Sequence, residues 1–218
     1  MPALDNLDQA RVASRSTETT RAALIKAATS VFAEYGYGGG SVRLITQRAM
    51  ANQAAVNYHF GGKDGLYREV LMAATRAFEE NAFLDPEELD ALSPEDALRR
   101  YLHQFLLPLV KRDRVSRFLR IFAWESVQPS EVFSAFIAHS PPRIFRLAER
   151  VVRRFLSQDA SAETVTFAML WLAQQPMFFV RDAERLAQPP FSLKFDEDAL
   201  ERLVETLAGL SLRGLAGV

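Results

Sequence analysis

The segment from Ser41 to Lys63 constrains the fold of this chain most, because it combines two short helical patterns with a tight turn between them. It reads SVRLITQRAMANQAAVNYHFGGK. Ser41 and Asn52 each carry a short polar side chain of the kind that caps a helix N-terminus. Gly61 and Gly62 interrupt the second pattern before a longer helix begins. The segment therefore predicts a helix-turn-helix unit.

The rest of the chain favours helices throughout. Apolar residues recur at helical spacing from Thr17 to Tyr35, and Gly36 starts a glycine-rich break. No segment shows the alternation typical of a strand, so we expect an all-α fold of about nine or ten helices. Leu84 to Pro94 is acidic and contains proline, which predicts a connection. The remaining helices are expected at about 63–81, 94–112, 114–126, 131–139, 141–157, 162–183 and 196–213.

This pattern predicts an N-terminal three-helix unit followed by a larger helical domain. Residues 1–16 show no periodicity and are expected to form a flexible N-terminal arm. Residues 17–65 form the predicted helix-turn-helix domain, and residues 66–218 form the C-terminal domain.

Composition excludes several classes of function. The chain has 218 residues and no cysteine, which removes disulfides and thiolate metal sites. There is no signal-peptide core and no apolar run of the roughly 20 residues that a membrane span needs, so we expect a soluble cytoplasmic protein. The three histidines lack metal-type spacing, and no phosphate loop or nucleophile elbow occurs. We therefore expect no enzyme activity, no metal and no cofactor.

Charge is distributed unevenly along the chain. The net charge is −1 overall. Residues 1–65 hold seven Lys or Arg and five Asp or Glu, a net +2, whereas the remainder holds 19 basic and 22 acidic residues, a net −3. This mild asymmetry has the sign expected of a DNA-facing N-terminal part.

The second short helix has the residues that a DNA-reading helix needs. Such a helix places short polar side chains at its N-terminal end, facing base edges in the major groove. Gln53 and Asn57 can each pair bidentately with adenine, and Ala54 and Ala55 can touch a thymine methyl group. Val56 provides the apolar back, with Phe60 one turn later. Candidate phosphate or base contacts are Arg43, Tyr58, His59 and Lys63. The alternative is a small helical domain with a solvated Asn/Gln patch.

Residues 17–70 resemble the DNA-binding domain of TetR-family transcriptional regulators. The likeness runs through TRAALIKAATSVFAEYGY, SVRLITQRA and VNYHFGGKDGLYREVL. Two positions depart from the family pattern: Met50 replaces the usual turn glycine, and Val56-Asn57 replaces Leu-Tyr. The resemblance implies double-stranded DNA contacts at Arg43, Gln53, Ala54, Ala55, Asn57, Tyr58, His59 and Lys63.

The resemblance also implies a homodimer built from the last two helices, which would read a palindromic operator. The same residues could instead be the core of a monomer. The expected interface residues are Phe167, Trp171, Gln174, Phe178, Leu203, Leu207 and Leu210.

A small-molecule effector pocket is the third implication of the resemblance. The middle of the chain is rich in aromatic residues, although an aromatic stripe at helical spacing is more often core. Arg117 and Arg120 are further candidates for the polar part of this pocket. The predicted pocket residues are His103, Phe105, Phe118, Phe122, Trp124, Glu125, His139 and Trp171.

Together these features predict a sequence-specific repressor that a hydrophobic or aromatic effector releases from its operator. The alternative is a helical small-molecule-binding protein with a vestigial helix-turn-helix. In that case Met50, in place of the turn glycine, would reflect the loss of DNA binding.

Overall fold

The computed structural model describes residues 3–80, 84–139 and 143–215, and the side chains of residues 3–16, 79–80, 139 and 215 lie outside that description. Every regular element in the described residues is a helix, as the sequence predicts. The helices are α1 (Ala3–Gly39), α2 (Val42–Ala49), α3 (Gln53–Phe60), α4 (Lys63–Glu80), α5 (Pro86–Ala91), α6 (Pro94–Leu106), the 3₁₀ helix η1 (Leu107–Leu109), α7 (Arg114–Glu125), α8 (Glu131–His139), α9 (Arg143–Val152), α10 (Ala162–Leu186) and α11 (Glu197–Leu215).

The stretch from Leu84 to Pro94 is not merely a connection, because it contains α5. Asp85 caps this helix by accepting from the Glu87 N–H at 3.0 Å, and Pro86 occupies its first turn, where a missing N–H costs nothing. Ser93 then caps α6 through the Asp96 N–H at 3.1 Å. Two helices that each begin with a proline follow one another closely here, and their prolines produce the pattern that predicts a connection.

Helix α1 includes the backbone of residues 3–16, where a flexible arm was expected. Their flexibility remains a prediction. At its other end α1 is interrupted at Gly36, whose φ of 66° and ψ of 178° are not helical. A Cβ there would lie 3.2 Å from the ring of Trp124 on α7, so the glycine serves both the bend and the close approach of α7.

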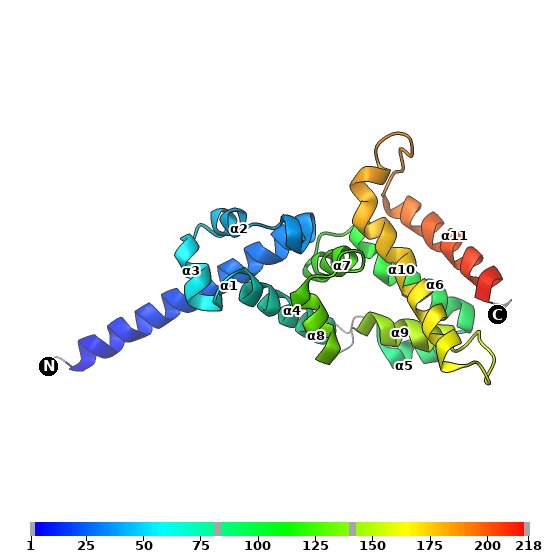
Figure 1. Cartoon of the computed structure of the whole chain (residues 1–218), viewed down its shortest axis with the longest axis horizontal. Helices are drawn as coiled ribbons and strands as arrows, with labels where there is room; N and C mark the ends of the chain where they lie inside the picture. The colour runs from blue at the N-terminus through cyan, green and yellow to red at the C-terminus, as the bar shows by residue number, and fades with distance from the viewer. Residues whose placement is uncertain (1–2, 81–83, 140–142, 216–218) are drawn as a thin grey trace.

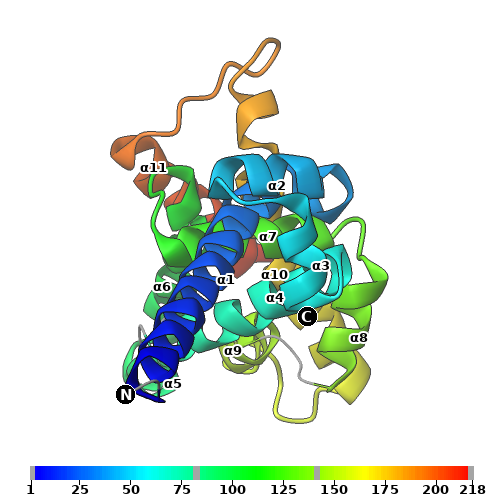
Figure 2. The same ribbon diagram turned by 90° about the vertical axis from the view of Figure 1, so that its left-hand side faces the viewer.

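The helices form an elongated molecule with the N- and C-termini at opposite ends (Figure 1). Helices α1, α2 and α3 lie at one end, and α6, α9, α10 and α11 lie at the other. Helix α7 lies between them and packs extensively against α1 and α10. Figure 2 shows α2 and α3 beside α1, with α4 behind them.

One continuous hydrophobic core joins the two ends. Tyr67 of α4, Phe32 of α1 and Phe118 of α7 are among its largest fully buried side chains. Helix α4 packs against α1 and α3 on one side and against α7 and α8 on the other. It therefore links the helix-turn-helix to the rest of the chain. Among the described helices, none is long and apolar enough to cross a membrane.

Candidate DNA-binding interface

The turn between α2 and α3 is held by two caps and one left-handed residue. The Ser41 hydroxyl accepts from the Leu44 N–H at 3.2 Å, and the Asn52 side-chain oxygen accepts from the Ala54 N–H at 2.9 Å. Between them Met50 adopts φ 51° and ψ 41°, and its side chain is 95% exposed. Met50, at the position where the resemblance places a glycine, therefore has a positive φ, and its side chain makes little packing contact in return for that strain.

Helix α3 divides into a buried back and an exposed front. Val56 is fully buried against the core, as the sequence predicts, and Phe60 is half-buried. Gln53, Ala54 and Asn57 are exposed, whereas Ala55 is only half-exposed. The front of α3 therefore presents two exposed amides on a short, firmly seated helix, and no described residue occupies their side-chain donors and acceptors.

The predicted phosphate-binding residues surround this front. Arg43 on α2 is exposed, and Tyr58 is 80% exposed with its ring edge-on to His59 at 5.0 Å between centroids. Lys63 is half-buried, and its ammonium lies 4.2 Å from the centroid of the Tyr37 ring. Burial lowers the pKa of Lys63. Lys63 thus already has a partner within the protein, which the sequence analysis did not foresee.

Tyr37 packs against the first turns of α4. Its hydroxyl donates to the Asp64 carboxylate, and its ring lies 4.8 Å from that of Tyr67. Burial, together with the hydrogen bond to Asp64, raises the pKa of Tyr37 to about 12. The hydroxyl consequently stays protonated and keeps donating over the whole neutral range.

The step from α3 into α4 depends on Gly65. A Cβ at this position would lie 1.8 Å from the carbonyl oxygen of Phe60, which no side chain can tolerate. Gly61 adopts a left-handed φ of 72° and ends α3 with its N–H on the Asn57 carbonyl at 2.9 Å. The sequence predicts the break at Gly61-Gly62, whereas the contact at Gly65 leaves no signal in it.

An ion pair joins α2 to α1. Arg48 donates from both terminal nitrogens to the Glu34 carboxylate, at 2.7 and 2.8 Å, and its guanidinium lies 5.9 Å from the Tyr35 ring centroid. The hydrogen bond from Arg48 lowers the pKa of Glu34. Because both side chains are partly exposed, the pair contributes at most about 1 kcal/mol to stability. Its importance is geometric, since it ties the first helix of the motif to the long helix beneath it.

Glu125, predicted to belong to an effector pocket, is buried among donors of the protein itself. It accepts from the Tyr67 hydroxyl at 2.6 Å, the Ser130 N–H at 2.6 Å and the Ser130 hydroxyl at 3.0 Å. Burial raises the pKa of Tyr67. Glu125 therefore links α4, α7 and the start of α8.

The other predicted pocket residues do not gather around one space. Phe118 and Phe122 of α7 form an aromatic cluster with Phe78 and Phe133, whereas Phe105 of α6 packs on Tyr101. His103 contacts Glu201 of α11 at 3.2 Å, and Trp171 is exposed on α10. Trp124 lines one cavity of about 370 Å³ beside α7, and Phe118 lines another of about 390 Å³. The side chain of His139 lies outside the described residues.

The predicted dimer residues are all exposed on α10, whereas those on α11 range from exposed to buried. On α10, Phe167 is 62% exposed, Trp171 is 42% exposed, and Gln174 and Phe178 are also exposed. On α11, Leu210 is exposed, Leu203 is half-buried and Leu207 is buried in the core. Helix α10 therefore carries an apolar stripe, formed by Phe167, Leu170, Trp171 and Phe178, that the described residues leave uncovered. In the part of the chain that the structure describes, no group of three or more His, Cys, Asp or Glu side chains is placed to hold a metal ion.

Comparison with known proteins agrees with this arrangement. Residues 24–70 match the model of the family described as bacterial regulatory proteins, tetR family. Residues 94–215, more than half of the chain, match the C-terminal domain of the HTH-type transcriptional dual regulator CecR.

Individual relatives are more distant. The chain is 35% identical over 89 residues to the HTH-type transcriptional repressor NicS of Pseudomonas putida, and the alignment spans 40% of this chain and 41% of that repressor. A transcriptional regulator from Rhodococcus sp. Rha1 is 22% identical and superposes with a TM-score of 0.56 over 89% of this chain and 96% of its own. AibR, solved with isovaleryl coenzyme A and operator DNA, is 17% identical to this chain. It superposes with a TM-score of 0.60 over 88% of this chain and 97% of its own.

Proposed function

Because this chain belongs to the TetR family of bacterial regulatory proteins, we propose that it is a homodimeric transcriptional repressor that reads its operator with α3. The observation that carries the proposal is the two-sided character of α3. Val56 is fully buried on one side, and Gln53 and Asn57 are exposed on the other. A helix seated in this way can enter the major groove without losing its packing.

The front of α3 suits adenine-containing base pairs. An amide side chain can donate to one edge atom of adenine and accept from its neighbour, and a good bidentate pair contributes about 1–3 kcal/mol of discrimination. Arg43 and Tyr58 flank these amides and can reach phosphates. Gln53 and Asn57 are therefore proposed as base readers, with Ala54 and Ala55 against thymine methyl groups and His59 and Lys63 at the phosphate backbone.

The proposed dimer uses the apolar stripe of α10 together with Leu210 of α11. A single recognition helix makes too few contacts for specific binding, so two copies reading half-sites about one helical turn apart are the expected arrangement. Burying exposed aromatic side chains against a second copy supplies the driving force. A two-fold dimer implies a palindromic operator.

The proposed effector is a small molecule held by the C-terminal domain. AibR, whose fold this chain shares, was solved with both an acyl coenzyme A and operator DNA. In this chain α7 packs against α1, so a ligand that moves α7 also moves the helix that carries the motif. The relatives of this chain are transcriptional regulators, which supports a regulatory rather than an enzymatic role, and we propose a cytoplasmic location.

A binding assay with DNA from beside the protein's own gene tests this proposal. Fluorescence anisotropy should show that the Gln53→Ala/Asn57→Ala protein binds this DNA at least about tenfold more weakly than wild type, since two bidentate pairs are lost. Gln128→Ala, an exposed amide after α7, is the matched control and should bind like wild type. Equal binding by the double variant would remove α3 as the base reader.

A further inference from the structure

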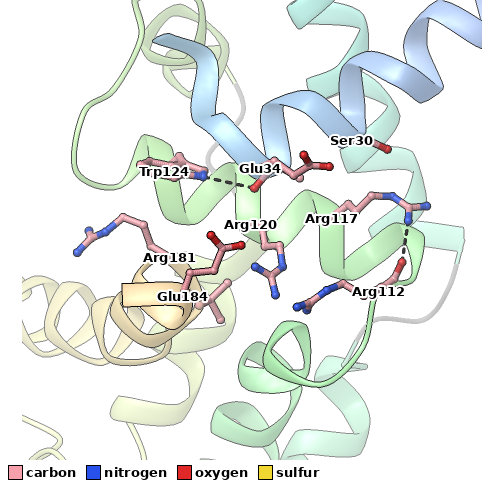
Figure 3. Close-up of a pocket in the computed structure, with 10 residues that line it drawn as sticks. Ser30, Glu34, Arg112, Arg117, Arg120, Trp124, Arg181 and Glu184 are labelled. Atoms are coloured by element: carbon pink, nitrogen blue, oxygen red, sulfur yellow. Dashed lines mark hydrogen bonds between the residues drawn. The ribbon is translucent and has the colours of Figure 1, made fainter. Parts of the chain in front are cut away.

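A cavity of about 370 Å³ lies where α1, α7 and α10 meet, and we call it the junction cavity. Ser30, Ala33 and Glu34 of α1 form one wall, and Val180, Arg181 and Glu184 of α10 form another. Arg117, Arg120 and Trp124 of α7 lie between them, with Arg112 just before that helix. Figure 3 shows these side chains coming from all three helices, with Arg120 between Arg112 and Glu184, and with the ends of Arg117 and Arg181 directed away from that group.

Three of the four arginines at the junction cavity are held by carbonyl groups alone. Arg112 donates to the Pro108 carbonyl at 2.8 Å, and Arg120 donates to the same oxygen. Arg117 donates to the Arg112 carbonyl at 2.7 Å (Figure 3). Within the described part of the chain, none of the three forms an ion pair with a carboxylate. These carbonyl contacts position the guanidinium groups without neutralising them.

The acidic side chains nearby do not balance this charge. Glu34 is already engaged by Arg48, and Arg181 is already paired with Asp182. Glu184 is then the one remaining acid among the lining residues against Arg112, Arg117 and Arg120, which leaves an excess of two positive charges in this lining. Burial and the nearby Arg112 lower the pKa of Arg120 to about 10. The buried Nε of Arg120 also has no hydrogen-bond partner among the described residues.

The surroundings add to the positive field. A second cavity, on the other side of Arg117, is lined by Lys26 and Arg76, and none of the described residues that line it is acidic. Residues 111–120 read KRDRVSRFLR, and the single acid, Asp113, is used to cap α7 through the Ser116 N–H at 2.7 Å. Like charges held this closely repel one another, so an anion placed among them is strongly favoured.

We propose that the junction cavity binds a small oxyanion with at least two negative charges, either a phosphate or a dicarboxylate, through Arg112, Arg117 and Arg120. Planar guanidinium groups match both classes bidentately. Trp124, whose indole N–H donates to the Ala33 carbonyl at 3.3 Å, supplies an apolar wall for the rest of the ligand. This charged site is separate from the buried aromatic cluster of Phe78, Phe118, Phe122 and Phe133.

Occupation of the junction cavity alters DNA affinity, because its walls belong to both ends of the molecule. Glu34 lines the cavity and also holds Arg48 of α2, the first helix of the motif. An anion beside the arginines repels the Glu34 carboxylate, which lines the same cavity. It also draws α7 and α10 together beneath α1. The ligand thereby makes different contacts in different placements of the helix-turn-helix, which is the requirement for coupling.

Isothermal titration calorimetry of the full chain with sodium pyrophosphate and, separately, disodium succinate tests the site at constant ionic strength set with sodium chloride. We expect one anion bound per chain, with the better ligand identifying the class. Arg117→Gln/Arg120→Gln should weaken binding at least about tenfold, since two charge-assisted hydrogen bonds are lost. Arg153→Gln, at an exposed arginine that follows α9 and pairs with Glu149, is the matched control and should bind like wild type.

Glu184→Gln guards against a result caused only by misfolding. Removing the acid that opposes the ligand should tighten binding severalfold, which damage to the fold cannot do. The site is wrong if neither anion binds at millimolar concentration, if the double variant binds like wild type, or if Glu184→Gln does not tighten binding.

The coupling has its own measurement, which rests on the proposed function. Saturating anion should change the affinity of wild type for DNA from beside its gene, and should leave that of the Arg117→Gln/Arg120→Gln protein unchanged. An identical response in both proteins would overturn the coupling. If the protein binds no DNA at all, the proposed function fails, and the calorimetry still decides the site.

Discussion

Met50 holds the turn between α2 and α3 in a left-handed conformation that glycine adopts without strain. Its φ is 51° and its side chain lies almost entirely in solvent. The sequence alone located this strain, because the resemblance places a glycine at this position. The cost of a left-handed non-glycine residue is about 1–2 kcal/mol, and part of it is offset by the lower chain entropy of methionine in the unfolded state.

Met50→Gly should therefore raise the free energy of unfolding by about 0.5–1 kcal/mol. Urea denaturation followed by circular dichroism measures this change. Met50→Ala retains the backbone strain while losing the side chain, so it should unfold like wild type. A Met50→Gly protein no more stable than Met50→Ala would show that the strain is absorbed elsewhere.

Gly65 shows a constraint that only the three-dimensional contact reveals. The sequence pattern marks Gly61 and Gly62 as a helix break, whereas Gly65 lies inside the apolar periodicity of α4 and gives no local signal. Its requirement comes from the carbonyl of Phe60, which approaches too closely for any Cβ.

Gly65→Ala should displace α3 from α4 and destabilise the protein by more than about 3 kcal/mol, because backbone rather than a flexible side chain blocks the new atom. Gly38→Ala is the control, since a Cβ there meets nothing within 4 Å. Thermal unfolding should separate the two proteins clearly. Similar melting temperatures would contradict the close approach at Gly65.

At the scale of elements, local signals account for most helix boundaries. Ser41 and Asn52 act as caps where the sequence predicts them, and α8 has the predicted bounds. Helix α5 was missed because its six residues are too few for apolar periodicity. Contacts between elements leave no pattern along the chain. Arg48 and Glu34 are separated by 14 positions in the sequence, and Tyr67 and Glu125 by 58.

The hydrogen bond from Tyr67 to Glu125 offers a test of how α4 is fastened to α7. Tyr67→Phe removes one of three donors from a buried carboxylate and should lower the free energy of unfolding by about 1–3 kcal/mol. Tyr58→Phe, on an exposed tyrosine of α3, should have little effect on stability. Equal denaturation midpoints for the two variants would show that the Tyr67 hydroxyl contributes nothing net.

At the scale of the whole molecule, the sequence predicted an all-α chain in which a small N-terminal motif precedes a larger helical domain. It did not predict where charge accumulates in three dimensions. The density of arginine in residues 111–120 was a signal, but its meaning depends on α1 and α10 closing over α7. The predicted effector and interface residues rest on the resemblance to the TetR family, and some of them, such as Leu207, lie in the core.

The proposed dimer makes a direct prediction about assembly. Trp171→Glu places a charge in the middle of the α10 stripe and should convert a dimer into a monomer at micromolar concentration, since an unpaired charge in an apolar interface costs several kcal/mol. Sedimentation velocity measures the change. Val127→Glu, an exposed residue after α7, should remain dimeric. The α10 stripe is not the interface if the Trp171→Glu protein also remains a dimer.

The most direct test of the central claim, that α3 and its surroundings form a working DNA reader, is the salt dependence of affinity for DNA from beside the protein's own gene. Each phosphate contact releases counterions on binding, so the logarithm of the association constant should fall linearly with the logarithm of salt concentration. We predict tight binding at low salt, this linear fall, and a preference over unrelated DNA. Absence of measurable binding at low salt would contradict the account and favour a small-molecule-binding protein with a vestigial motif.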